Sequence, residues 1–334
     1  MAFARELQVD PYSAIVAGVS YQTLEAAINY AQTTGGASSA VRWFIRCAPA
    51  DYAPAGGALT IPAGIVLWTP APFLTNISLS VGIDAYVPYG IVGFNVESTG
   101  NYALRHHQDS SGSNMRGWVE SCRIRVNKSQ NGITSAVELT GSQSVGLFHG
   151  MNSYFYGSNG YTGSNPSGTA QLVGVRLKSD YVVYAEFFGC HFKTSTGSAG
   201  TAQPILVLNE SVAPATVWGY VHMAFCDWED VHGDNGITPH PKLLVSSNTV
   251  HEGAMLDVGY LNVHSQALPT IAMAYSGDYK DSVLYSRNLH VGRTIGPLYR
   301  NDGGVDFGVS PTIVQTRAPL VSDAAPEGTQ WTRS

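Results

Sequence analysis

The stretch Gly189-Cys-His-Phe-Lys193 has a counterpart in Phe225-Cys-Asp-Trp-Glu229, 36 residues later. Each stretch places a Cys and a large aromatic residue two positions apart, with polar residues between and after them. Side chains of a β-strand alternate between its two faces, so the pattern predicts strands with Cys and the aromatic ring inward and the polar residues outward. A strand that recurs in this way predicts a chain built from stacked repeats.

The pattern recurs between residues 118 and 291. If the large inward residue of each strand is taken as its anchor, the successive gaps are 31, 37, 36, 35 and 26 residues. The anchors are Ile124, Phe155, Phe192, Trp228, Val263 and Leu289. A second set of apolar strands lies at 136–141, 173–179, 205–209, 242–246 and 270–274. Two or three strands per repeat, joined by turns of uneven length, are typical of stacked coils, whereas a propeller blade needs four.

A helix is expected before the repeats, over Ser20–Gln32, with Ser20 as its N-cap. Its apolar residues fall at i, i+3, i+4 and i+7, which gives one buried stripe. They are Leu24, Ala27, Ile28 and Ala31. Short strands are expected to follow at 41–47, 59–61 and 65–68.

The motifs Leu24-x-Ala-Ala-Ile28 and Leu59-Thr-Ile-Pro-x-Gly-Ile-x-Leu67 resemble the opening of pectin-lyase-like proteins. The resemblance spans about residues 20–68. It implies an all-β fold, a right-handed single-stranded parallel β-helix (a solenoid) with an N-terminal capping α-helix.

The chain is expected to divide into a lead or attachment segment (1–19), a parallel β-helix domain (20–310) and an extended C-terminal tail (311–334). In the tail, Ala324-Ala-Pro-x-Gly-Thr-x-Trp331 is similar to segments that follow β-helices in bacteriophage tailspikes and related virion proteins. This resemblance implies a homotrimer on the virion surface, with other virion proteins as partners.

Composition excludes several classes of partner. Only 13% of the residues are charged and the formal net charge is −6, without a run of Lys or Arg, which argues against nucleic-acid binding. The apolar stretches are shorter than the 18–20 residues that would indicate membrane insertion. Glu6 and Asp10 interrupt the region where a signal peptide would need an apolar core. We therefore expect synthesis in the host cytoplasm and release without secretion.

Neither a metal nor a cofactor is expected. The four cysteines form no Cys-x-x-Cys pair, and buried, reduced thiols are the simplest interpretation. They are Cys47, Cys122, Cys190 and Cys226. The spacing of the histidines suits no known metal site, so we expect them to be surface residues. They include His106, His107, His222, His232 and His240, with Asp234 nearby.

The outward positions of the anchor strands form the candidate binding site. Just before the anchors come Arg123, Tyr154, His191, Asp227, Asn262 and Asn288, and just after them come Arg125, Tyr156, Lys193, Glu229, His264 and His290. Aromatic and polar side chains in neighbouring columns are suited to holding sugars. The carbohydrate-binding candidates are Tyr154, Tyr156, His191, Lys193, Asn262 and His264.

Asp227 and Glu229 are the catalytic candidates. They point the same way from one strand, about 6.5–7 Å apart, which lies in the range of an inverting glycosidase. The alternative is a solvated mixed-charge patch with His191, Lys193 and His264. The clustered Asp pairs, Gly-His-Gly and Arg-x-Lys of polygalacturonase-like enzymes are missing from the sequence.

Three functions follow from these patterns. The favoured one is a structural surface protein of a bacteriophage virion (tailspike, tail fibre or capsid-decorating appendage) that binds a bacterial surface glycan or a partner subunit. The second is a tailspike depolymerase that cleaves such a polysaccharide through Asp227 and Glu229. The third is a free pectin-lyase-like carbohydrate enzyme, which the lack of a signal peptide disfavours.

Overall fold

The computed structural model describes residues 5–108 continuously and, beyond them, mainly the strands. The later described ranges are 116–127, 133–141, 146–158, 171–179, 183–196, 201–202, 206–208, 219–232, 242–246, 255–258, 261–265, 272–274, 283–286, 289–291, 299–300, 305–306, 312–315 and 330–333. Side chains are described in residues 5–107, 116–127, 135–140, 147–157, 185–193 and 225–226, and the backbone alone elsewhere.

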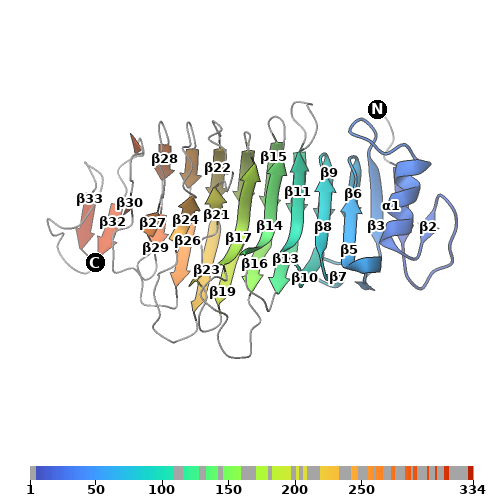
Figure 1. Cartoon of the computed structure of the whole chain (residues 1–334), viewed down its shortest axis with the longest axis horizontal. Helices are drawn as coiled ribbons and strands as arrows, with labels where there is room; N and C mark the ends of the chain where they lie inside the picture. The colour runs from blue at the N-terminus through green and yellow to red at the C-terminus, as the bar shows by residue number, and fades with distance from the viewer. Residues whose placement is uncertain are drawn as a thin grey trace.

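Three long parallel sheets contain most of the described strands (Figure 1). Sheet A contains, in spatial order, β2 (Ser20–Tyr21), β1 (Arg5–Val9), β3 (Trp43–Cys47), β6 (Ile65–Trp68), β9 (Tyr89–Val92), β12 (Arg116–Glu120), β15 (Gly146–Met151), β18 (Val183–Phe188), β22 (Gly219–Ala224), β25 (Met255–Val258), β28 (Val283–Ser286) and β31 (Val305–Asp306). Sheet B contains β4 (Asp51–Tyr52), β7 (Thr75–Leu79), β10 (Phe94–Ser98), β13 (Arg123–Asn127), β16 (Tyr154–Ser158), β19 (His191–Thr196), β23 (Cys226–His232), β26 (Leu261–Ser265) and β29 (Leu289–Val291). Sheet C contains β5 (Ala58–Ile61), β8 (Gly82–Tyr86), β11 (Tyr102–Gln108), β14 (Ile133–Gly141), β17 (Gln171–Ser179), β21 (Leu206–Leu208), β24 (Lys242–Ser246), β27 (Ala272–Ala274) and β30 (Tyr299–Arg300), with β20 (Thr201–Ala202) beside β17.

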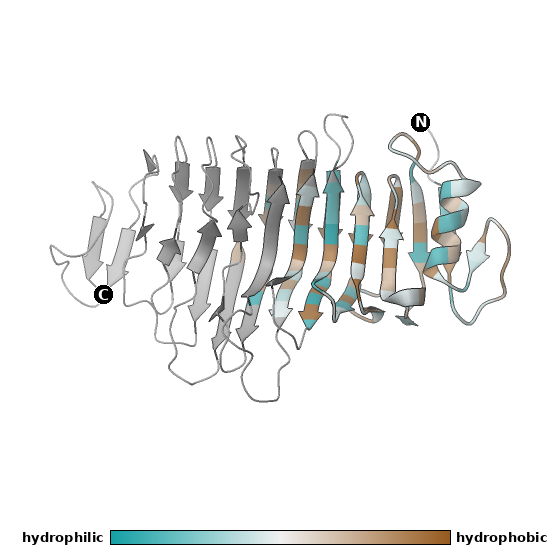
Figure 2. Cartoon of the chain, in the orientation of Figure 1, coloured by the Kyte–Doolittle hydropathy of each residue, from teal (hydrophilic) through white to brown (hydrophobic). Residues whose placement is uncertain are grey.

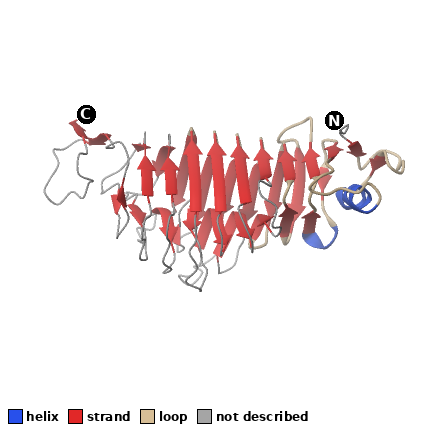
Figure 3. Ribbon diagram, turned by 90° about the horizontal axis from the view of Figure 1, so that it is seen from above, coloured by secondary structure: helices blue, strands red, loops and turns tan. Residues whose placement is uncertain are grey.

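The chain passes through the sheets in a fixed order, so neighbouring strands of a sheet are about three strands apart in sequence. For example, β9, β10 and β11 lie in sheets A, B and C, and β12, β13 and β14 lie beside them in the same order. We call three such successive strands a coil. The ladders between coils are parallel, and the coils follow one another along the long axis of the molecule in both views (Figures 1 and 3). The expectation of a mainly β chain with parallel sheets is therefore confirmed.

The sequence pattern predicted two or three strands per repeat, and sheet A supplies the third. The two strand sets found in the sequence correspond to sheets B and C, and each coil adds a third strand in sheet A. The remaining elements are a 3₁₀ turn at Ala55–Gly57 and a separate parallel pair, β32 (Thr312–Gln315) and β33 (Gln330–Arg333), within the segment expected to be an extended tail.

Helix α1 spans Leu24–Thr33 and buries the predicted apolar stripe. Its N-cap is Thr23, whose hydroxyl accepts a hydrogen bond from the backbone N–H of Ala26 at 3.2 Å. The prediction of Ser20 as N-cap was wrong, because Ser20 belongs to β2 and pairs with Gln8 of β1. Since β1 also pairs with β3, the expected lead segment supplies a strand to sheet A.

Among the described residues, inward side chains of all three sheets form one hydrophobic core, and apolar and polar residues alternate along the strands that Figure 2 colours. Part of this core is an aromatic cluster. Phe155 lies 5.5 Å from Phe192, 5.7 Å from Phe187 and 6.4 Å from Phe148, measured between ring centroids. All four rings are at most 1% exposed, so consecutive coils are joined by ring-to-ring contacts as well as by backbone ladders.

The predicted column of cysteines is confirmed. Cys122 and Cys190 directly precede β13 and β19, and Cys226 is the first residue of β23. All three are buried free thiols, and Ser153, directly before β16, occupies the equivalent position in the coil between the first two. The Ser153 hydroxyl accepts a hydrogen bond from the backbone N–H of Cys122. Burial raises the pKa of Cys122 to about 12, so it remains a thiol at neutral pH.

The corner between sheets A and B is a turn of one or two residues that repeats in every described coil from β9 to β23. One residue of each turn has a left-handed backbone, with φ between 45° and 89°. These residues are Gly93, Ser121, Asn152, Gly189 and Phe225. Backbone hydrogen bonds also connect this corner between coils, for example from Ser121 N–H to the carbonyl of Met151 at 3.0 Å.

The last predicted anchor was shifted by two residues. Val263 of β26 pairs with Val291, and Leu261 pairs with Leu289. Apolar residues occupy alternate positions in this strand, so the sequence pattern alone permits either register.

Replacing Phe155 by Ala is expected to lower the free energy of unfolding by about 3–5 kcal/mol, because it removes a fully buried ring and leaves a cavity. Urea unfolding followed by circular dichroism measures the change. The matched control is Tyr154→Ala, one position away on the outer face, which is expected to cost less than ~1 kcal/mol. Equal losses of unfolding free energy in the two variants would contradict the assignment of Phe155 to the inner face and Tyr154 to the outer face.

Candidate functional site

The outer face of sheet B carries two rows of side chains, because the parallel register aligns equivalent positions of successive coils. Row 1 consists of Asp51, Asn76, Asn95, Arg123, Tyr154, His191, Asp227, Asn262 and His290. Row 2 consists of Ser78, Glu97, Arg125, Tyr156, Lys193, Glu229 and His264. The register thus brings the predicted binding residues into neighbouring columns.

Four of the predicted binding residues have described side chains: Tyr154, Tyr156, His191 and Lys193. Asp227, Glu229, Asn262 and His264 are placed by their backbone alone, and Asn288 lies outside the described residues. His290 pairs with Asn262, so it belongs to row 1 and not beside His264, as the shifted anchor had implied.

In the middle of the two rows, cationic and aromatic side chains of successive coils contact one another. The Arg123 guanidinium lies over the Tyr154 ring at 5.8 Å, and the Arg125 guanidinium lies over the Tyr156 ring at 5.1 Å. On the next coil, the Lys193 ammonium lies 5.8 Å from the Tyr156 centroid, and the His191 ring lies 5.3 Å from that of Tyr154. Cations therefore contact Tyr156 from both neighbouring coils.

Row 1 continues toward the N-terminus as a ladder of amides. The Asn76 amide donates to the Asp51 carboxylate, and the Asn95 amide donates to Asn76 Oδ1 at 2.9 Å and to the carbonyl of Phe73 at 2.7 Å. Asn95 Oδ1 is buried without a hydrogen-bond partner among the described atoms.

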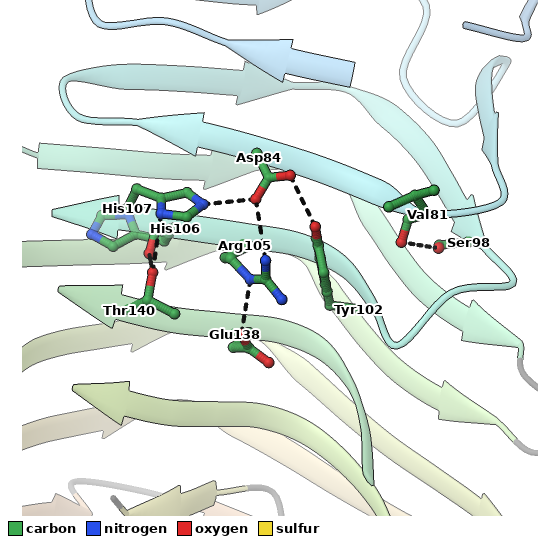
Figure 4. Close-up of polar contacts among 9 residues, drawn as sticks. All are labelled: Val81, Asp84, Ser98, Tyr102, Arg105, His106, His107, Glu138 and Thr140. Carbon is green, nitrogen blue, oxygen red and sulfur yellow. Dashed lines mark hydrogen bonds and ion pairs between the residues drawn. The ribbon is translucent and has the colours of Figure 1, made fainter. Parts of the chain in front are cut away.

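A second polar cluster lies on the outer face of sheet C (Figure 4). Asp84, Arg105 and Glu138 are aligned on three successive strands. Arg105 Nε donates to Glu138 Oε1 at 2.8 Å, and an Arg105 terminal nitrogen lies 3.6 Å from Asp84 Oδ1. The Tyr102 hydroxyl donates to Asp84 Oδ2 at 2.9 Å, and the Arg105 guanidinium lies over the Tyr102 ring at 3.8 Å.

His107 connects this cluster to a second row on sheet C, in which it is aligned with Tyr86 and Thr140. Its Nε2 lies 2.7 Å from Asp84 Oδ1, and its Nδ1 lies 3.3 Å from the Thr140 hydroxyl. Thr140 itself donates to the carbonyl of His106 at 3.0 Å, so its proton is not directed at His107. The ring of Tyr86 stacks on His107 at 4.5 Å. With its hydroxyl proton engaged in this way, Thr140 is not arranged as a nucleophile activated by His107.

The carboxylate of Asp84 is held in its charged form. Burial raises its pKa, but hydrogen bonds from His107 and Tyr102 and the positive charges of His107 and Arg105 outweigh burial and leave the pKa below its ordinary value. Burial and the bond to Asp84 raise the pKa of Tyr102 to about 12. Glu138 is only 2% exposed although it points outward, so Arg105 provides the charge compensation that a buried carboxylate requires.

Sequence reasoning missed this cluster, although a signal was present. Polar residues alternate with an apolar one in Glu138–Thr140, and Arg105–His107 is polar throughout, but the charges that pair are 33 residues apart. Only the register between coils brings them together.

His106 is a core residue and not the surface histidine expected from the sequence. It is 3% exposed and its Nδ1 lies 3.0 Å from the buried hydroxyl of Tyr89. Its ring meets Phe148 edge-on at 5.6 Å. Burial, with a smaller effect of the His107 charge, lowers the pKa of His106 to about 3. It is therefore neutral at physiological pH.

The described side chains contain no group of three or more His, Cys, Asp or Glu that could hold a metal ion. Of the expected histidine cluster, His222 and His232 are placed by backbone alone and His240 is outside the described ranges. Within the described chain, no helix is both long and apolar enough to span a membrane.

Comparison with known proteins yields little beyond these observations. No family model matches the chain, and no curated protein matches it. Among solved structures, that of rice weevil pectin methyl esterase is similar with a TM-score of 0.40 and 11% identity, over 85% of this chain and 90% of that chain. A likeness at this level carries no information about activity.

We expect acid to destabilise the protein through His106. Its pKa is about 3 in the fold and about 6.5 when unfolded, so the unfolded chain takes up a proton that the folded one does not. Above pH 6.5, His106 does not reduce the free energy of unfolding. Below it, this free energy falls by about 1.4 kcal/mol per pH unit as the pH decreases toward 3. Urea unfolding at pH 6.5, 5.5 and 4.5 measures this slope.

The variant His106→Gln should reduce the pH dependence of the free energy of unfolding by about 1.4 kcal/mol per pH unit, which corresponds to the uptake of one proton. This expectation holds whatever the stability of the variant at neutral pH. Tyr89→Phe is the control, because it removes the hydrogen bond to His106 but keeps the titrating ring, and it should retain the slope. An unchanged slope in His106→Gln would exclude this histidine as the cause.

Proposed function

We propose that this chain is a right-handed parallel β-helix on the surface of a bacteriophage virion, where it binds a host surface glycan through the outer face of sheet B. The strand order, with one strand per sheet in each coil, supports the β-helix. Right-handedness is proposed because connections between parallel strands are right-handed in about 98% of cases. The resemblance of residues 324–331 to tailspike segments supports the virion setting.

The observation that carries glycan binding is the stacking of rows 1 and 2 over three consecutive coils. Tyr154 is 43% exposed and lies between Arg123 and His191 in its row. The backbone ladders fix the rows before any ligand arrives, which lowers the entropy cost of binding. Aromatic faces and polar groups at coil spacings of ~4.8 Å are suited to an extended sugar chain.

Binding without cleavage is the favoured form of the proposal. The described carboxylates of this face, Asp51 and Glu97, lie in different rows and two coils apart. Asp51 accepts a hydrogen bond from Asn76, and Glu97 accepts one from Asn127. Both are therefore engaged in the polar ladder and are not arranged as an acid and base facing one bond.

The alternative, a depolymerase, is favoured by the backbone positions of Asp227 and Glu229. They occupy rows 1 and 2 of β23, directly beside His191 and Lys193. A polysaccharide lying along the rows would therefore pass over both carboxylates.

A homotrimer with contacts to other virion proteins remains part of the proposal. The A–B corner supports it, because this edge bears large apolar side chains that are exposed in a single chain. They are Met151 (38%), Phe188 (51%) and Phe225 (64%). Sedimentation at micromolar concentration tests the assembly, and a monomer would count against it.

Tyr154→Ala should weaken glycan binding about tenfold, which corresponds to the loss of one aromatic contact of ~1.4 kcal/mol. Binding is first measured on an array of bacterial surface polysaccharides and then by calorimetry with the strongest ligand. The matched control is Tyr86→Ala on sheet C, also a partly exposed tyrosine (36%), which should bind normally. The proposed surface is wrong if the two variants behave alike.

The wild-type protein is expected to release no reducing ends from the polysaccharide that it binds. If the wild-type protein does release reducing ends, and the double variant Asp227→Asn/Glu229→Gln does not, the depolymerase function would be established. Reducing-end assays and size-exclusion chromatography of the polysaccharide provide the two measurements.

A further inference from the structure

The parallel register aligns a third row of residues at an outward position of sheet A, which we call row 3. It consists of Trp118, His149, Glu186, His222 and Asp257, on successive strands from β12 to β25. The last four follow one another at intervals of 37, 36 and 35 residues, which is the length of a coil in this part of the chain. Imidazole and carboxylate groups are metal ligands, so residues of metal-binding type occupy one position of four successive coils. A motif on this scale has no local signature, which is why the sequence predicted no metal site.

His149 and Glu186 are the two potential ligands of row 3 whose side chains are described, and they are in contact. Nδ1 of His149 lies 3.1 Å from a carboxylate oxygen of Glu186, and the two side chains are 20% and 42% exposed. Two ligand atoms bonded to one tetrahedral Zn²⁺ ion at about 2.0–2.2 Å are about 3.3 Å apart, so a small shift would allow one ion to bond to both. Nε2 of His149 is buried without a hydrogen-bond partner among the described atoms. Nδ1 is therefore the nitrogen that an ion would bind.

The side of His149 that faces the N-terminus is closed to an ion. The Trp118 ring lies so close to Gly90 of the preceding coil that a Cβ atom there would be 2.5 Å from it, and the Arg42 guanidinium lies over the same ring at 5.7 Å. Arg116, whose positive charge acts on His149, belongs to the same strand as Trp118. Because an indole and two guanidiniums offer no lone pair to a metal ion, an ion bound to His149 would lie on the opposite side, toward the strands that follow β15.

On that opposite side, the register brings two more residues of row 3 into line. His222 is aligned with Glu186 and Asp257 with His222, and both are placed by their backbone. Successive strands are about 4.8 Å apart, so His149 and His222 flank Glu186 at one strand spacing each, and one ion beside the carboxylate is within reach of both. Asp257 is three strand spacings from His149, roughly 14 Å, which is too far for the same ion. It occupies instead the position from which a carboxylate accepts a hydrogen bond from a ligating histidine.

An ion-pair ladder is the other role open to such a row, and sheet C contains one. There the cation between Asp84 and Glu138 is Arg105, whose guanidinium has no lone pair for a metal ion. In row 3 both neighbours of Glu186 are histidines, and a histidine offers a lone pair when it is neutral. The alternation of imidazole and carboxylate therefore favours metal binding over a purely electrostatic ladder.

We propose that His149, Glu186 and His222 bind a Zn²⁺ ion, and that Asp257 orients the ring of His222. Two imidazoles and one carboxylate form a ligand set that Zn²⁺ favours, and three protein ligands leave the fourth position to water or to another ligand. The site belongs to sheet A, so it is independent of the glycan surface proposed for sheet B.

The first test titrates the full wild-type chain, freed of metal by EDTA, with Zn²⁺ in a calorimeter. One ion per chain should bind with a dissociation constant of about 1 µM or less. An excess of Mg²⁺ should leave this affinity unchanged, because Mg²⁺ prefers oxygen ligands. X-ray absorption spectra of the loaded protein should show nitrogen and oxygen ligands at about 2.0–2.2 Å, with the outer scattering of two imidazoles. These spectra identify the ligands without any substitution.

His149→Gln, Glu186→Gln and His222→Gln should each weaken Zn²⁺ binding by about a hundredfold or more, since even residues that only hydrogen-bond to metal ligands contribute about 10–100-fold. Asp257→Asn removes a residue of that second kind and should weaken binding by about tenfold. The matched control for Glu186→Gln is Glu120→Gln, which also removes a carboxylate from sheet A but lies outside row 3. It should leave the Zn²⁺ affinity unchanged.

The site is overturned if Zn²⁺ does not bind at micromolar concentration, if the spectrum lacks imidazole scattering, or if Glu186→Gln and Glu120→Gln have equal affinities. Absence of binding, together with a loss of unfolding free energy in Glu186→Gln and not in Glu120→Gln, would identify row 3 as an ion-pair ladder. The control for the histidines is His191→Gln on sheet B. An affinity that falls as far in this variant as in His149→Gln would place the ion elsewhere and would also overturn the assignment.

Discussion

The backbone ladder between successive coils determines almost every other feature of this structure. Parallel hydrogen bonding aligns each residue with its equivalent in the next coil, at a spacing of about 4.8 Å. Equivalent positions of successive coils therefore form columns, such as Cys122, Ser153 and Cys190 inside sheet B and the polar rows outside it. Shifting one strand by a single residue would exchange the inner and outer columns, so the buried aromatic cluster and the outer rows depend on the same register.

The two outer faces use this register differently. On sheet C, opposite charges alternate from coil to coil and neutralise each other, and even the buried Glu138 has its cation. On sheet B, amides, arginines and tyrosines follow one another, and stacking takes the place of ion pairing. The paired charges of sheet C contribute stability, and the stacked side chains of sheet B form the surface for which we propose glycan binding. The contrast is informative because both faces belong to the same coils and share one backbone geometry.

The sequence was sufficient for the features that depend on residue type within one strand. Alternation identified the inward column of Cys122, Cys190 and Cys226 and the aromatic anchors, and a 3.6-residue period identified the buried stripe of α1. It was insufficient for features that depend on a neighbouring coil. The Arg105–Glu138 pair joins residues 33 positions apart, and the inward position of His106 became evident only with the register of β11. The predicted strands at 41–47 and 65–68 belong to sheet A as β3 and β6. The sheet A strands from β9 onward were missed, because a turn of only one or two residues joins each of them to the next strand of sheet B from β9 to β23. The functional roles of Asp227, Glu229, Asn262 and His264 depend on side chains beyond the described part of the chain.

The short corner between sheets A and B constrains how such a molecule can change during evolution. From β9 to β23, an inserted residue there would have to be accommodated next to a left-handed backbone position, and this corner is bonded to the next coil. These coils keep a turn of one or two residues, whereas the earlier connection between β6 and β7 spans residues 69–74. The connection between sheets B and C varies more, from residues 99–101 in one coil to residues 159–170 in a later one. Length changes between sheets B and C therefore leave the spacing of the rows on sheet B unchanged, because these rows begin at the short corner.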